Sequence, residues 1–211
     1  MVSAANDFAC KFHKLTLTIK SEEKNVRCFW VNLNNPAYVK YHDHEWGVPQ
    51  HDDGKLFELL VLESFQAGLS WECILNKRGE FRRAFDGFDA EKIAKYDQDK
   101  VEELMLNSGI IRNRMKINAA IKNAQAFLAI QQEFGSFNNY IQTFTNRITV
   151  TEPCDAHTTS PLSDAISKDL KKRRMSFVGP TTIYSFLQAI GVINGHTAEC
   201  FLHPSHIQER T

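Results

Sequence analysis

The stretch LKKRRMSFVGPTTI, residues 170–183, joins two predicted helices through a short turn. The first helix is expected over 160–174, because Pro161 fits the first position of a helix. The second is expected over 180–190, and Gly191 is a suitable stop for it. The segment is therefore a candidate helix–hairpin–helix unit. Its function has to be inferred together with the rest of the chain.

The turn before the second helix is a candidate DNA-binding element. The first N–H groups of that helix have no partner within it, and Gly179 places no side chain in front of them, so they are able to hold a phosphate oxygen. Basic residues upstream would add positive charge. The same pattern is also typical of an ordinary bundle turn, where a basic last turn complements the helix dipole. The candidate DNA-contacting residues are Gly179, Thr181, Thr182, Lys171, Lys172 and Arg173.

Apolar residues at helical spacing predict helices along most of the remaining chain. Asp and Ser residues suited to capping stand where these helices begin. Expected helices cover 52–68, 71–85, 112–134 and 137–144, with two short ones capped by Asp89 and Asp97, and a second Gly-containing turn lies at 108–111. Residues 145–160 are β-branched and polar and predict an irregular connection. The expected fold class is all-α.

Composition limits the classes of function. The 211 residues include 25 basic and 25 acidic ones, so any contact with nucleic acid must come from local patches. No apolar run is long enough to span a membrane, and five irregularly spaced cysteines indicate a reducing, cytoplasmic setting. We expect a loosely structured extension over 1–25, with a short strand at 15–19, then one helical domain over 26–205 and a tail over 206–211.

Glu63 occupies a position where an apolar side chain is expected. Leu56, Leu59, Leu60 and Glu63 follow the i, i+3, i+4, i+7 spacing of a core-facing stripe. Isolated burial of a carboxylate is costly, so Glu63 must reach water at the rim, form a structural ion pair, or serve in a pocket. Aromatic residues on both sides of it in the sequence favour the pocket, because aromatic rings attract a flat cationic ring. These aromatic residues are Trp30, Tyr38, Tyr41, Trp46 and Trp71.

Cysteine and histidine residues form several pairs with ligand-like spacing: Cys10–His13, Cys154–His157, Cys200–His203 and His196–Cys200. Only the last pair has the i, i+4 spacing that places both donors on one side of a helix. Two further ligands, Cys28 and His42, are available near the other end of the chain. A Cys2His2 set suits tetrahedral Zn²⁺, although lone Cys and His residues usually belong to the core or the surface.

Five motifs together resemble one family. They are RCFW at 27–30, YHDHEWGVP at 41–49, LESFQAGLSW at 62–71, GIIRNRMKI at 109–117 and SFVGPTTIYSFLQAIGVINGH at 176–196. In this order they are similar to the 3-methyladenine DNA glycosylase I family, the bacterial constitutive type. The similarity covers about 27–204, which is nearly the whole chain beyond the extension.

The resemblance implies the helix–hairpin–helix glycosylase fold, with two helical lobes and a base pocket between them. It implies a structural zinc ion that joins the two chain ends through Cys28, His42, His196 and Cys200. The base-recognition carboxylate of the family falls on Glu63, and its pocket aromatics fall on the five residues named above. The Asn194-Gly195 pair stands where the wider superfamily has an aspartate, and Phe65 replaces a usual glutamine, which puts the fine shape of the pocket in doubt.

The hypothesis that follows is a monofunctional DNA glycosylase that flips 3-methyladenine out of alkylated double-stranded DNA and hydrolyses its N-glycosidic bond. It is expected to act as a monomer. Two alternatives stay open: a zinc-stabilised helical DNA-binding module without catalysis, and a bifunctional glycosylase in which a lysine also cleaves the strand.

Overall fold

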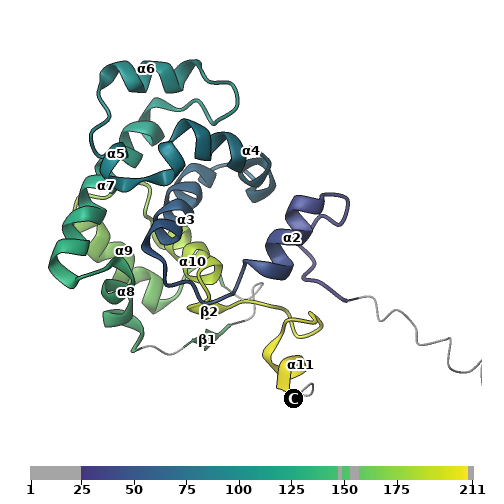
Figure 1. Ribbon diagram of the computed structural model, residues 1–211. Coiled ribbons are helices and arrows are strands. Elements are labelled where there is room, and N and C mark those ends of the chain that lie inside the picture. The colour runs from purple at the N-terminus through teal and green to yellow at the C-terminus, as the bar shows by residue number, and fades with distance from the viewer. Residues whose placement is uncertain (1–24, 147–148, 153–156, 209–211) are drawn as a thin grey trace, which may run out of the picture.

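The computed structural model describes residues 25–146, 149–152 and 157–208, and it is built mainly of helices (Figure 1). The predicted extension over 1–25, with its strand at 15–19, lies outside the described residues except for Asn25. The predicted boundary between residues 205 and 206 falls inside the last helix, α11 (Pro204–Gln208). Within the described ranges no helix is long and apolar enough to cross a membrane.

The centre of the fold is α3 (Asp53–Gln66), which contacts helices on several sides. Asp52 caps it by accepting a hydrogen bond from the N–H of Lys55, as the sequence predicts. Nearly all of its residues after the first turn are buried, because α4, α7, α8 and α10 pack around it. This position explains why α3 reads as continuously apolar, with Glu63 as an exception on its inner face.

The other helices follow the predicted order, and each α-helix among them begins at a side-chain cap or a proline. The first of them, α2 (Pro36–His44), starts at Asn35, whose side chain accepts from the N–H groups of Ala37 and Tyr38. The remaining elements are α4 (Trp71–Ala84), the 3-10 helix η1 (Asp86–Phe88), α5 (Ala90–Ile93), α6 (Gln98–Leu106), α7 (Arg114–Phe134), α8 (Phe137–Thr145), α9 (Pro161–Lys172) and α10 (Pro180–Ala189).

The all-α prediction is wrong in one detail. Two short strands, β1 (Val150–Thr151) and β2 (Ile193–Asn194), pair in parallel, and β1 lies in the segment predicted to be irregular (Figure 1). Two residues are too few to show a periodicity, so the pairing is a tertiary feature that local sequence does not encode. It joins the chain after α8 to the chain after α10.

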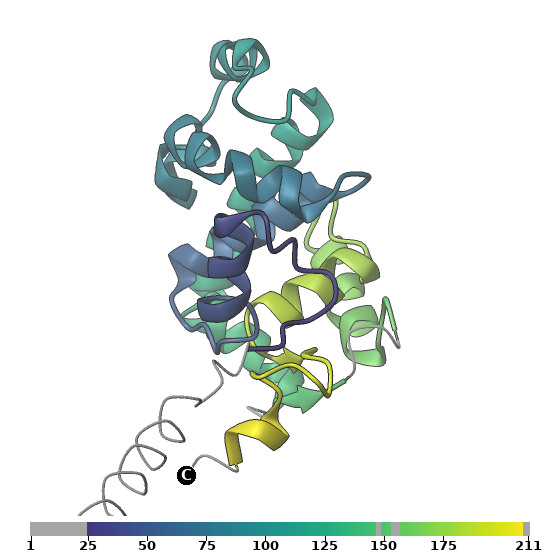
Figure 2. The same ribbon diagram turned by 90° about the vertical axis from the view of Figure 1, so that its right-hand side faces the viewer.

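The two ends of the described chain lie side by side (Figure 2). The N–H of Phe201 donates to the carbonyl of Val26 at 2.8 Å, so the segment before α2 meets the segment before α11. Gly191, in a left-handed conformation with φ of 73°, ends α10 beside the loop that follows α2. A side chain there would meet the backbone of residues 47–49 at 2.6–2.8 Å, so only glycine allows this approach.

Candidate functional site

A cavity of about 230 Å³ opens beside Glu63. Side chains from α2, α3, α4, α10 and the segments that flank α2 line it, so four helices far apart in sequence contribute to one pocket. The lining includes every aromatic residue that the sequence singled out and adds three polar residues. The lining residues are Trp30, Tyr38, Tyr41, Trp46, Glu63, Gln66, Trp71, Ser185 and Gln188.

Glu63 is only 5% exposed, and neither an arginine nor a lysine is paired with it among the described ion pairs. Its Oε2 atom is buried without a hydrogen-bond partner in the described part of the chain. Burial raises the pKa of Glu63 to about 8, because the charged form loses its hydration. The geometry therefore excludes a rim position and a structural ion pair for Glu63. The remaining interpretation is a carboxyl group that lines a pocket.

The aromatic rings form two groups around this carboxyl group. Tyr41 and Trp71 lie with ring centroids 5.2 Å apart. In the second group, Trp30 contacts Tyr38 at 5.5 Å and Trp46 at 4.8 Å between centroids. The helical segment from Pro36 places both tyrosines on its buried face, as their three-residue spacing requires. Such a slot suits a flat ring, and the aromatic faces favour a positively charged one.

The polar lining residues on α10 were missed by the sequence analysis. Ser185 and Gln188 lie three residues apart in the mostly apolar second half of the helix, and this spacing is the signal that could have found them. The Nε2 atom of Gln188 and the Nε1 atom of Trp71 are buried with no partner among the described residues. Unpaired buried donors cost free energy, so the pocket holds hydrogen-bonding capacity for a ligand.

Phe65 does not shape the pocket, contrary to the doubt that its replacement of glutamine raises. It is fully buried on the side of α3 away from the pocket lining. Its ring packs against Phe81 at 4.9 Å and Phe85 at 5.7 Å between centroids, within the core that α3 shares with α4. The substitution therefore belongs to the core.

A second constellation joins the chain ends. The ligand atoms of Cys28, His42, His196 and Cys200 all lie within 4.8 Å of one another, and all four residues are buried. The Sγ of Cys200 is 3.4 Å from Nδ1 of His196 and 3.5 Å from Nε2 of His42. Sulfur and nitrogen ligands of a tetrahedral zinc ion are separated by roughly 3.6 Å, from typical Zn–S and Zn–N bond lengths. The donor set and its spacing therefore fit zinc.

Asp43 supports this constellation from outside. Its Oδ1 lies 2.8 Å from Nδ1 of His42, which leaves Nε2 of His42 directed at the sulfur ligands. Arg27 in turn donates two hydrogen bonds to Oδ2 and one to Oδ1 of Asp43. Burial by itself would raise the pKa of this carboxyl group, but the hydrogen bonds with Arg27 and His42 outweigh it and hold the pKa below its usual range. A carboxylate behind a ligating imidazole fixes the orientation of the ring, as in established zinc sites.

The prediction that a helix presents His196 and Cys200 is wrong. Residues 196–200 form an irregular segment and a turn, in which the N–H of Cys200 donates to the carbonyl of Thr197 at 2.9 Å. The turn brings the two donors together as closely as a helical turn would. Of the other candidate ligands, His157 and His203 are not part of this cluster, whereas Cys10, His13 and Cys154 lie outside the described residues.

The comparisons with known proteins agree with this geometry. Residues 30–203 match the methyladenine glycosylase family. The chain belongs to this family. It is 45% identical over 184 residues to DNA-3-methyladenine glycosylase 1 of Escherichia coli (strain K12), covering 85% of this chain and 98% of that protein. It is 42% identical over 179 residues to DNA-3-methyladenine glycosylase of Haemophilus influenzae, covering 83% and 96%.

Solved structures of the family have the same fold. A crystal structure of 3-methyladenine DNA glycosylase I matches with a TM-score of 0.81 and 46% identity, over 85% of this chain and all of that one. A structure of the Staphylococcus aureus enzyme, described as showing the basis of 3-methyladenine recognition, matches with a TM-score of 0.76 and 38% identity, over 82% of this chain and 92% of that one. The mainly helical architecture is therefore that of a methyladenine glycosylase.

The predicted hairpin of this methyladenine glycosylase lies between α9 and α10, which pack against each other. The N-terminus of α10 has no side-chain cap, because its N-cap residue is Gly179. A Cβ at this position would meet open space. Lys171, Lys172 and Thr181 are exposed, and Thr182 is half-buried. The first turn of α10 is thus accessible and has basic residues near it in the sequence.

Arg173 differs from the other predicted DNA contacts. Its guanidinium donates to Asp169 at 2.7 Å and to Glu133 at 2.6 Å, and it lies over the rings of Phe134 and Tyr140. These contacts use its donors within the fold and neutralise its charge, which the sequence pattern could not reveal. The other Gly-containing turn, at 108–111, is also engaged: Lys77 donates to the carbonyls of Ser108 and Gly109.

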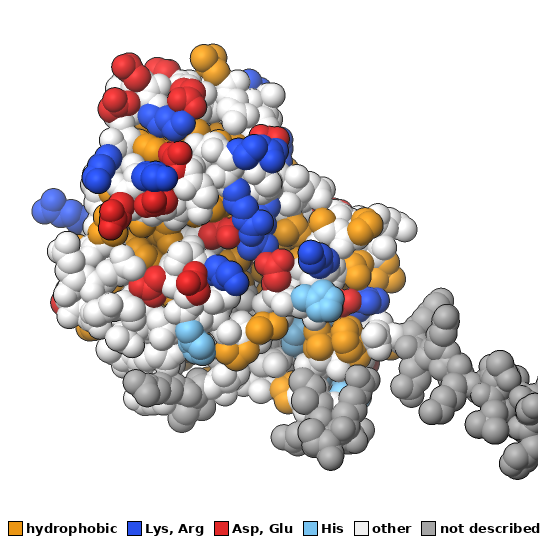
Figure 3. All heavy atoms as spheres, viewed as in Figure 1, with side chains coloured by type: hydrophobic (Ala, Val, Ile, Leu, Met, Phe, Trp, Pro, Cys, Tyr) orange, Lys and Arg blue, Asp and Glu red, His pale blue; other side chains and the backbone are white. Residues whose placement is uncertain are grey.

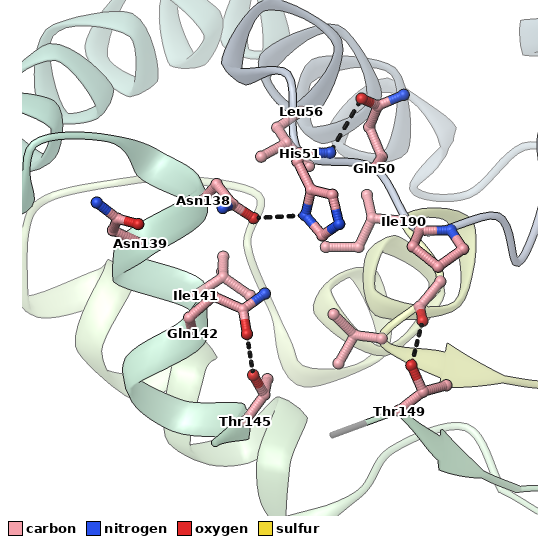
Figure 4. A pocket seen from close by; sticks show the side chains of 13 residues that line it. Gln50, His51, Leu56, Asn138, Asn139, Ile141, Gln142, Thr145, Thr149 and Ile190 are labelled. Atoms are coloured by element: carbon pink, nitrogen blue, oxygen red, sulfur yellow. Dashed lines mark hydrogen bonds between the residues drawn. The ribbon is translucent and has the colours of Figure 1, made fainter. Parts of the chain in front are cut away.

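The charged surface and a second cavity differ in character from the site at Glu63. Basic and acidic side chains are interspersed on the face seen in Figure 3, in keeping with the balanced composition. A larger cavity, of about 560 Å³, lies between α8 and the segments around residues 50 and 190 (Figure 4). Amides and hydroxyls line it together with His51, which pairs with Asn138 at 3.1 Å, and it contains no carboxylate or thiol. The cavity beside Glu63 differs from it in that a buried carboxyl group without a partner lies among aromatic rings.

Proposed function

We propose that this chain is a monofunctional DNA glycosylase of base-excision repair that removes 3-methyladenine from alkylated DNA. The observation that carries the proposal is the buried carboxyl group of Glu63, unpaired and set among five aromatic rings. The relatives named above support the substrate, since their descriptions state 3-methyladenine as the base on which they act.

Methylation at N3 gives adenine a positive charge, and the pocket suits such a base. Trp30, Trp71 and the tyrosines would stack on its faces, with attraction between the rings and the cation. Glu63 would accept hydrogen bonds from its amino edge. Charge on the base favours the ionised form of Glu63, so binding of the base and ionisation of the carboxyl group support each other. An uncharged adenine gains neither the attraction between a cation and the aromatic rings nor the charge pairing with Glu63.

The reaction begins when the damaged nucleotide leaves the base stack, at a cost of a few kcal/mol that is smaller for a damaged base. The bond between C1′ of the sugar and N9 then breaks, and its electron pair goes to the base, which leaves neutral. Water adds to the oxocarbenium-like sugar and loses a proton, so the products are free 3-methyladenine and an abasic site. None of the described residues that line the pocket is a lysine, so no Schiff base is expected.

The duplex would be held by the accessible first turn of α10. Its free N–H groups at Gly179, with the hydroxyls of Thr181 and Thr182, would receive a backbone phosphate. Lys171 and Lys172 would add positive charge nearby, whereas Arg173 is already paired. With this role for the turn, the fold is that of a helix–hairpin–helix glycosylase, in which the pocket lies between two helical lobes.

Zinc would be held by Cys28, His42, His196 and Cys200, for which the spacing and donor chemistry are suitable. No open coordination position would remain, so its role is structural. It would tie the segment before α2, which includes Trp30, to the segment after α10.

The test measures release of 3-methyladenine from methylated DNA. We expect Glu63→Gln to lower the single-turnover rate by on the order of 100-fold, which equals about 2.7 kcal/mol. Trp71→Ala should lower it roughly tenfold, since stacking on an aromatic side chain contributes about 1–3 kcal/mol per base. Glu91→Gln, on exposed α5 surface, is the control and should match the wild type. Wild-type rates in both pocket variants would overturn these roles, and a strand nick trapped by borohydride would indicate lyase action.

A further inference from the structure

Lys116, in the first turn of α7, is buried, with 6% of its surface exposed. Its Nζ donates hydrogen bonds to the carbonyl oxygens of Phe65 at 2.7 Å and Ala67 at 2.6 Å. These carbonyls close the C-terminal end of α3, where the negative end of the helix dipole favours a cation. Lys116 therefore fixes the point at which the chain leaves α3, within four residues after Glu63, and turns toward Trp71.

The same helix also grips the turn between α9 and α10. Asn123, seven residues after Lys116 and so on the same face of α7, donates to the carbonyl of Ser176 at 2.9 Å and accepts from its N–H at 2.8 Å. The backbone of Phe177, in the same turn, has a left-handed conformation with φ of 56°. The centroid of its ring lies 5.8 Å from Nζ of Lys116. One face of α7 thus contacts the end of the pocket helix and the hairpin turn.

We propose that Lys116 is a positioning residue for the glycosylase reaction: it holds the α3–α4 segment of the base pocket in a fixed placement relative to the hairpin that grips the DNA backbone. The inference rests on the proposed function. Base excision needs two contacts at once, because the flipped base must reach Glu63 while its strand stays bound at the start of α10. A displacement of the pocket relative to the hairpin therefore impairs the reaction, even when each of them still binds its own part of the substrate.

The chemistry at Lys116 suits placement better than stability. An ammonium group loses hydration when it is buried, and the acceptors here are carbonyls without a carboxylate among them, so the gain in stability is small. Water could satisfy the same carbonyls. What two short hydrogen bonds from one side chain provide is a defined position for the loop that leads to Trp71.

The experiment compares Lys116→Met, Lys116→Arg and the control Lys122→Met, which removes an exposed lysine from the same helix. For each, kcat and KM are measured with methylated duplex, together with the Kd for free 3-methyladenine by tryptophan fluorescence and the Kd for undamaged duplex. We expect Lys116→Met to lower kcat at least tenfold while KM and both Kd values stay within twofold. Lys116→Arg should recover kcat to within threefold of the wild type, and Lys122→Met should match it.

Two results overturn the inference: a wild-type kcat in Lys116→Met, or a loss of affinity for the free base or for undamaged duplex that accounts for the fall in rate. If Lys116→Met does not fold, as judged by circular dichroism at the assay temperature, Lys116→Gln replaces it under the same criteria, because glutamine is polar but its shorter side chain does not reach as far as Nζ of lysine. A wild type that releases no 3-methyladenine overturns the proposed function instead, so the two failures are distinguishable.

Discussion

Arg78 on α4 and Glu58 on α3 form a buried ion pair, with Nε of Arg78 2.7 Å from Oε1 of Glu58. Arg78 also donates to Glu45 at 2.6 Å, so it joins both helices to the chain that follows α2. Removal of the Glu58 charge leaves the buried Arg78 with the more exposed Glu45 as its remaining carboxylate partner among the described residues. We expect Glu58→Gln to lower the free energy of unfolding by about 3 kcal/mol.

Urea denaturation checks this prediction, through a lower midpoint at an unchanged slope. The control is Glu80→Gln, which breaks the ion pair between Glu80 and Arg83 on the exposed face of the same helix α4. Exposed pairs contribute little, so the control should stay within about 0.5 kcal/mol of the wild type. Equal effects of the two substitutions would show that burial does not strengthen the Arg78 pair.

Glu63 should make stability depend on pH. Burial raises its pKa from 4.5 to about 8, so between these values the folded chain keeps a proton that the unfolded chain has released. The stability contributed by the protonated group is complete below the lower value and is lost as pH rises through the higher one. We expect Glu63→Gln, which stays neutral, to gain on the wild type by on the order of 4 kcal/mol between pH 4.5 and pH 8.

The measurement is the difference in unfolding free energy between the two proteins at each pH. Groups common to both, including the metal ligands, cancel in this difference. A gap that stays constant with pH would contradict the raised pKa of Glu63.

Activity should depend on the same ionisation. The pH profile of kcat/KM reports the free enzyme, so it should rise with pH toward about 8, where Glu63 becomes charged. In the complex the positive base lowers the pKa of Glu63, so the rising limb of kcat should lie at lower pH. Single-turnover and steady-state rates measured between about pH 6 and pH 9 check both limbs, because this interval brackets the raised pKa of Glu63. Loss of both limbs in Glu63→Gln assigns them to this residue, and their persistence would assign them elsewhere.

Metal content should depend on the buried cluster. Purified protein should contain about one zinc ion per chain, as expected for one structural site. Cys200→Ser should lose it, and a chelator should lower the Tm of the wild type but not of this variant. Cys73→Ser is the matched control, because Cys73 is a free cysteine outside the cluster. Folded protein without metal, or metal retained by Cys200→Ser, would reject the site.

Much of the helical architecture could be predicted from local signals. Asp52, Ser136 and Pro161 stand at helix starts, and the structure places them there. The pocket around Glu63 could also be predicted, because a carboxyl group on an apolar stripe is conspicuous and the aromatic residues near it in sequence lie near it in space. Capping residues were the signal in the first case, and in the second it was the periodicity of α3 together with aromatic residues nearby in sequence.

What could not be predicted depends on contacts distant in sequence. The pairing of β1 with β2 joins residues more than forty positions apart, as in Val150 with Ile193. Arg173 looks like a phosphate ligand in sequence, but Glu133 from another helix neutralises it. Lys116 looks like a solvated lysine in the first turn of a helix, yet the end of α3 buries it. Charge in a sequence does not show which charges are already paired.

One continuous helix, α10, carries both the open N-terminus at Gly179 and the pocket residue Gln188. A helix advances about 1.5 Å and turns about 100° per residue, so the nine steps between them set a rise of roughly 13 Å and a fixed rotation. Under the proposed function, this helix sets the distance between the bound phosphate of the strand and the extruded base. A single inserted or deleted residue between Gly179 and Gln188 would rotate Gln188 by about 100° and turn it away from the cavity. The length of α10 is therefore the dimension that this protein must conserve under the proposed function.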